Sequence, residues 1–85
     1  HEALRYGLGE RLMAELFDRV VEASELSGIF ARGTLSRALR RAGAEPETLS
    51  RSTLSAALPE IRRAIAPFVE RRIDEVMGNI ERLTR

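Results

Sequence analysis

The sequence predicts an all-α fold, a small single-domain helical bundle of four to five helices in which long first and last helices flank two short central ones. Three observations favour it. Apolar residues recur every three to four positions along most of the chain, which is the spacing of an amphipathic helix. Gly, Pro, Ser and Thr cluster between these stripes, where helices begin and end. The 85 residues suffice for one domain with one core.

The ends of the chain differ in how they fit this domain. The chain opens at His1 without Met, which indicates a tag remnant or the cut edge of a longer protein. Residues 1–9 therefore read as a frayed or tag-derived N-terminus. Residues 10–85 read as a single helical domain.

The first helix is expected from Glu10 to about Leu26, with Gly28 as the residue that ends it in a left-handed conformation. Its acidic residues fall on the face opposite the apolar stripe. Glu15 and Arg19 stand four positions apart, in the order that favours an ion pair on a helix. The apolar stripe consists of Leu12, Met13, Leu16, Phe17, Val20 and Val21.

Two short helices are expected next, at about Leu35–Ala42 and Arg51–Leu58. Residues 29–33 read as a connector between helices, and we expect the Ile29 and Phe30 side chains to be buried in the core. The pattern Thr-Leu-Ser-x-Ala-Leu occurs twice here, starting at Thr34 and at Thr53. Helix capping and core leucines explain the repeat more simply than a duplicated unit does.

The last element runs from Pro59 to Thr84, and Pro67 either kinks it or divides it into two helices. Its apolar spacing is that of a coiled-coil seam of about two heptads. So short a seam must pack on something, either the first helix or the same helix of a second copy. The candidate dimer or packing seam is Val69, Ile73, Val76, Ile80 and Leu83.

Charge is unevenly distributed, although the net charge is only +1. Residues 1–30 hold three Arg against six acidic residues, whereas residues 31–63 hold seven Arg against three Glu. Every basic residue except His1 is Arg, as in proteins from GC-rich bacterial genomes. Arg also suits bidentate contacts with phosphate or carboxylate. The candidate partner or phosphate contacts are Arg37, Arg40, Arg41, Arg51, Arg62 and Arg63.

No residue pattern indicates an enzyme. The chain has no Cys and a single His, so thiolate chemistry and a histidine-assisted nucleophile have no candidates. The carboxylates are spread over helix faces without metal-ligand spacing, and no glycine motif for a phosphate is present. We expect no catalytic, cofactor-binding or metal residue. With no apolar run long enough for a membrane span, the expected location is cytoplasmic.

One segment resembles a helix-turn-helix. Ala42-Gly43 would end its first helix, and the Ser-capped segment from Ser50 to Leu58 would be its recognition helix. The resemblance implies that Arg51, Ser52, Thr53 and Ser55 lie in the major groove of DNA. However, Gly43 and Ser50 enclose six residues including a proline, where that family has three or four.

We therefore expect a non-enzymatic protein-interaction domain, regulatory or scaffolding, whose protein partner the sequence does not identify. Self-association through the C-terminal helix is part of this expectation. The alternative is a helix-turn-helix-like DNA-binding domain that uses residues 35–58. Neither a membrane nor a small-molecule substrate is implied.

Overall fold

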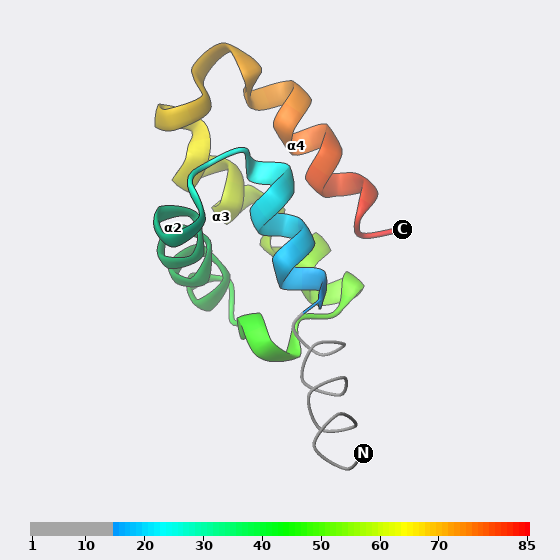
Figure 1. Cartoon of the computed structure of the whole chain (residues 1–85). Helices are drawn as coiled ribbons and strands as arrows, with labels where there is room; N and C mark the ends of the chain where they lie inside the picture. The colour runs from blue at the N-terminus through cyan, green and yellow to red at the C-terminus, as the bar shows by residue number, and fades with distance from the viewer. Residues whose placement is uncertain (1–14) are drawn as a thin grey trace, which may run out of the picture.

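The computed structural model describes residues 15–85, and every regular element in this part of the chain is helical (Figure 1). Helical residues form three continuous runs, of which the last is 32 residues long. That last run folds back on itself within residues 51–82 and remains one continuous run, although two of its segments lie side by side. The elements are the helix of residues 15–24, α2 (Gly28–Arg41), the short 3-10 turn η1 (Pro46–Thr48), α3 (Arg51–Val69), the 3-10 turn η2 (Glu70–Arg72) and α4 (Ile73–Arg82).

The all-α class is confirmed, but the predicted count of four to five helices is wrong. No break separates Leu58 from Pro59, because α3 continues through both Pro59 and Pro67. Both prolines are exposed, and so are Ser55 and Arg63, four residues earlier. Water can therefore hydrate the carbonyls that a proline leaves without a helical donor. The expected boundary between N-terminus and domain at residues 9 and 10 lies outside the described residues.

The helix expected at Leu35–Ala42 begins seven residues earlier, at Gly28. The Ala31 N–H donates to the Ser27 carbonyl at 2.6 Å and opens the helix. Thr34, expected as an N-cap, is only 7% exposed and lies inside α2. The buried stripe continues through it, and this burial outweighs the cost of about 1 kcal/mol for Gly33 within a helix.

The first helix ends at residue 24, and Glu25 takes the left-handed conformation expected of Gly28 (φ 63°). The buried Ser24 hydroxyl donates to the Val21 carbonyl at 2.6 Å and accepts from the Leu26 N–H at 3.3 Å. These two bonds satisfy the polar groups where the chain leaves the helix.

The chain reverses at Glu70, three residues beyond Pro67. Glu70, the first residue of η2, has φ 46° and ψ −110°, and η2 leads directly into α4. Figure 1 shows α4 returning beside α3, and Arg62 of α3 binds Asp74 of α4 with 2.7 Å between nitrogen and oxygen. The long last element is therefore a helical hairpin rather than a helix kinked at Pro67.

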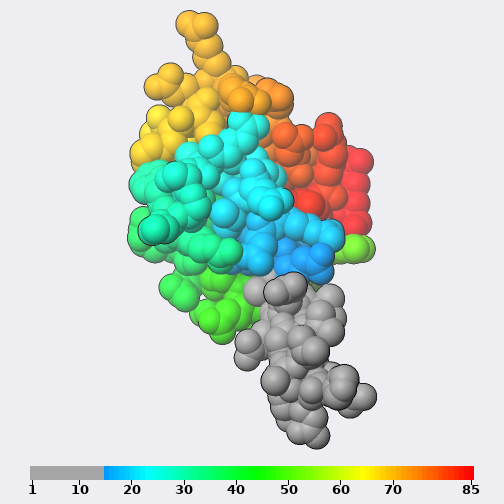
Figure 2. Space-filling view, viewed as in Figure 1, coloured from blue at the N-terminus to red at the C-terminus, as the bar shows by residue number. Residues whose placement is uncertain are grey.

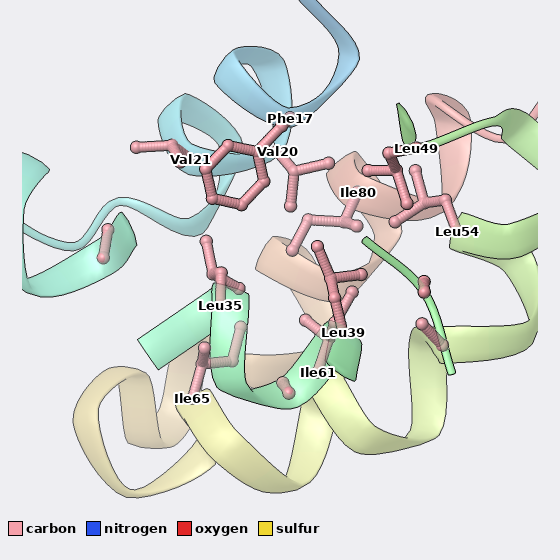
Figure 3. Packing of buried hydrophobic residues seen from close by; sticks show 14 of the residues in the cluster. Phe17, Val20, Val21, Leu35, Leu39, Leu49, Leu54, Ile61, Ile65 and Ile80 are labelled. Carbon is pink, nitrogen blue, oxygen red and sulfur yellow. The ribbon is translucent and has the colours of Figure 1, made fainter. Parts of the chain in front are cut away.

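One hydrophobic core joins all the helices within residues 15–85 (Figure 3). Val76 and Ile80 of the predicted seam are fully buried in it, and the other three seam residues are partly buried against it. The first helix and α4 run antiparallel, since Glu25 pairs with Arg72 at one end and Leu16 shares a hollow with Leu83 at the other. The buried apolar residues are Phe17, Val20, Val21, Ala31, Leu35, Ala38, Leu39, Ala44, Leu49, Leu54, Ala57, Ile61, Ile65, Val76, Met77 and Ile80.

We predict that Ile80→Ala lowers the free energy of unfolding by about 2–5 kcal/mol, because it leaves a cavity in a fully buried site. Ile29→Ala removes the same atoms from a side chain that is 93% exposed and should change it by no more than about 0.5 kcal/mol. Urea unfolding followed by circular dichroism measures both. Equal losses in the two variants would contradict the placement of Ile80 in the core.

Glu70→Gly should stabilise the domain by about 0.5–1 kcal/mol, because glycine adopts a positive φ without the steric cost that other residues bear. Glu70→Ala removes the same carboxylate but keeps the Cβ, so we expect no such gain from it. Thermal unfolding of both variants provides the comparison. A glycine variant that melts at or below the alanine variant would show that this reversal is not strained.

Candidate functional site

The six candidate contact arginines are all exposed, and most of them already have a carboxylate nearby. Arg37 and Arg51 form no ion pair within residues 15–85. Such exposed pairs contribute little to stability, but they reduce the charge available to a partner. The paired groups are Arg40 with Glu45 at 3.5 Å, Arg41 with Glu60 at 3.3 Å, Arg62 with Asp74 at 2.7 Å and Arg63 with Glu60 at 3.5 Å.

These arginines do not form one surface. Arg41 and Arg63 meet at Glu60, between α2 and α3, whereas Arg62 is directed toward α4. Arg51 lies at the start of α3, nine residues before Glu60 on the same helix. There it lines a shallow hollow of about 270 Å³ together with Glu15, Leu16, Arg19, Arg82, Leu83 and Arg85.

The segment that resembles a helix-turn-helix has a different geometry. The Ser50 hydroxyl accepts from the Thr53 N–H at 3.2 Å, and the Thr53 hydroxyl accepts from the Ser50 N–H at 2.9 Å, which makes a capping box. The Ser52 hydroxyl joins the same group at 3.2 Å. These hydroxyl groups therefore cap the N-terminus of α3.

The largest departure from the sequence-based expectation is an exposed apolar cluster, which we call the aromatic patch and define as Ile29, Phe30 and Phe68. These side chains are 93%, 42% and 54% exposed. The rings of Phe30 and Phe68 meet edge to face, with centroids 4.7 Å apart. Figure 2 shows α2 and the end of α3 adjoining on one face of the molecule. The expectation that the Ile29 and Phe30 side chains are buried in the core is wrong.

The phase of α2 explains why these residues are exposed. With 3.6 residues per turn, Ile29 is displaced by more than half a turn from the buried Ala31. If residues 29–33 are read as an irregular connector, Ile29 and Phe30 belong to no helix face, and the sequence does not predict which way their side chains point. Extending the stripe of Leu35 and Ala38 backwards along a helix would have placed Ile29 in solvent.

An ionic cluster holds the two chain reversals beside the aromatic patch. Arg72, just beyond the reversal after α3, binds Glu25, in the turn before α2, at 2.6 Å, and Glu75 at 3.2 Å. The hydrogen bond with Glu75 raises the pKa of Arg72 above its ordinary value, and the charges of Glu25 and Glu75 act in the same direction. The two segments that carry the patch are thereby tied together.

Residues 15–85 contain no group of three or more His, Cys, Asp or Glu side chains that could hold a metal ion. Within the same residues, no helix combines the length and the apolar character that crossing a bilayer requires.

A double-mutant cycle tests the ring contact in the patch. We predict a coupling free energy of about 0.5–1.5 kcal/mol between Phe30→Ala and Phe68→Ala, beyond their separate effects on unfolding. Urea unfolding of the two single variants and the double variant yields this value. Additive losses within about 0.3 kcal/mol would mean that the rings do not interact in solution.

Comparison of the chain with protein-family models, with curated proteins and with solved structures found no match.

Proposed function

We propose that this domain is a non-enzymatic protein-interaction module that binds its partner through the aromatic patch. The observation that carries the proposal is the exposure of Ile29, Phe30 and Phe68, the large apolar side chains that the described residues leave most open to water. The ring contact makes the exposed surface of Phe30 and Phe68 continuous, and exposed apolar patches are characteristic of binding sites. Aromatic residues are also the side chains most often found at the centres of protein interfaces.

The patch is well prepared for binding. The two rings already hold each other, and each comes from a regular helix, so little side-chain entropy remains to be lost on association. The Arg72 ion pairs connect the two neighbouring reversals. An exposed, partly apolar surface on two packed helices supports a scaffolding or regulatory role.

Self-association through the C-terminal helix has less support. Val76 and Ile80 are fully buried within the chain, so a dimer built on that seam would have to open the core first. Such an opening costs the burial free energy of both side chains before any interface forms. The aromatic patch is available without this rearrangement.

Helix-turn-helix-like DNA binding by residues 35–58 also has less support. Arg51 is exposed at the start of α3 as that alternative requires. However, α2 lies beside the second half of α3, with Phe30 at Phe68 and Arg41 at Glu60. In a helix-turn-helix the two helices instead cross steeply after a short turn.

Photo-cross-linking provides a direct test. A photoreactive phenylalanine analogue in place of Ile29 should form discrete adducts with another protein in the cells that make this chain. The same analogue at Ala56, which is exposed elsewhere on α3, should form none. The adducts should disappear when Phe68→Asp is added, because a carboxylate would disrupt the apolar surface.

Adducts that are equal at both positions, or that are unaffected by Phe68→Asp, would contradict binding through the patch. Micromolar binding of random-sequence duplex DNA would favour the alternative function instead. Such binding should weaken steeply between low and moderate salt and persist in the Phe68→Asp variant.

A further inference from the structure

The aromatic patch continues into a basic surface along α2 and α3. The two helices lie antiparallel, since Phe30 meets Phe68 near one end and Arg41 meets Glu60 nearer the other. One exposed face spanning both helices therefore runs from the apolar side chains to the arginines. We call this the α2–α3 face, formed by Ile29, Phe30, Gly33, Arg37, Arg41, Glu60, Arg63 and Phe68.

The α2–α3 face is strongly unbalanced in charge. The sequence of α2 contains no Asp or Glu, and Glu60 is the single acidic residue in α3. Glu60 is shared between Arg41 and Arg63, at 3.3 and 3.5 Å. Arg37 forms no ion pair within residues 15–85. The face therefore presents three guanidinium groups against one carboxylate.

The arginines and the patch have a defined spacing. Phe30 and Arg37 are seven residues apart on α2, which is two turns or roughly 10 Å. Arg37 reaches back across this interval, because its Nη1 atom lies 3.4 Å from where a Cβ on Gly33 would be. Gly33 itself has no side chain to obstruct a ligand. Positive charge thus begins about one turn from the aromatic patch.

We propose that the α2–α3 face binds an acidic amphipathic helix of a partner protein, an inference that rests on the proposed function. Apolar side chains of that helix cover Phe30 and Phe68. Its carboxylates, one to two turns further along, bind Arg37 and the two arginines that share Glu60. An apolar anchor supplies most of the affinity in such interfaces, and charge complementarity selects the partner and its direction.

A second copy of this chain fits the face less well. A two-fold interface brings the same surface from each copy together. Arg37, Arg41 and Arg63 of both copies would then gather at one interface with only a Glu60 from each. The repulsion among these like charges disfavours that arrangement, whereas a separate acidic helix neutralises the excess.

Selection from a displayed library of random peptides of about 16 residues, enough for four helical turns, tests this chemistry. Peptides are retained on the unchanged domain after removal of those that also bind the Phe30→Asp, Phe68→Asp double variant. We expect the retained sequences to be enriched in Asp and Glu, with aromatic or branched apolar residues one to two turns from the acids. Their affinity should fall steeply with added salt.

Charge reversal supplies the matched comparison. Arg37→Glu should weaken the selected peptides by about tenfold or more, and Lys in place of their acids should restore binding to this variant. Arg51→Glu changes the same charge at another exposed arginine that has no ion pair within residues 15–85. It should leave binding unchanged, and an acidic residue in the first turn of α3 should not harm the fold.

Retained peptides that are neutral or basic, or an equal loss in the Arg37 and Arg51 variants, would overturn the acidic-helix inference. So would the retention of no patch-dependent peptide. If adducts from Ile29 nevertheless persist and still depend on Phe68, the interaction function stands while this partner chemistry fails. A concentration-dependent dimer that Phe30→Asp abolishes would replace the acidic helix with a second copy.

Discussion

Every helix in the described part of the chain depends on burying one face in the same small core. Leu35, Leu39, Ile61, Ile65 and Ile80 are fully buried there and come from three different helices (Figure 3). A domain of this size has room for only one such core. Local preferences at helix ends therefore yield wherever they conflict with it. Pro59 lies within α3 and Thr34 lies within α2 for this reason.

The same constraint separates what the sequence predicts well from what it does not. Apolar periodicity identifies the stripes of the first helix, the central leucines and the C-terminal seam, because each stripe must face the core. The predicted boundaries rest on Gly28, Thr34 and Pro59, whose local preferences are worth only a few kcal/mol or less each. Tertiary packing overrides these preferences, so two predicted breaks are absent and the helix count is smaller.

The sequence does not predict the aromatic patch, because the predicted start of the second helix is too late in the chain. Treating residues 29–33 as an irregular connector left Ile29 and Phe30 without a helical phase, and their apolar character then suggested burial. Once α2 begins at Gly28, their exposure follows from the position of Ala31 and Leu35. Phe68 and Phe30 are distant in the chain and meet only through tertiary packing. No local sequence pattern predicts a contact of this kind.

Some of the charged residues form ion pairs within the chain, whereas others remain available to a partner. The acidic first helix supplies Asp18 to Arg32 and Glu25 to Arg72, so part of the asymmetry seen in the sequence is matched within the chain. Arg62 is likewise engaged by Asp74. The α2–α3 face keeps an excess of arginine, because Arg41 and Arg63 share Glu60 and Arg37 forms no ion pair within residues 15–85. The position of an arginine in the fold, rather than the net charge of its segment, decides whether it can meet a partner.

The reversal at Glu70 also has a consequence for the order in which the chain folds. Only the three residues of η2 separate α3 from α4, so their pairing closes a very short loop and costs little chain entropy. The contacts between the two helices of this hairpin join residues close in sequence, and contacts of this kind favour fast folding. The α3–α4 hairpin can thus be an early structure, onto which the helix of residues 15–24 docks and completes the core.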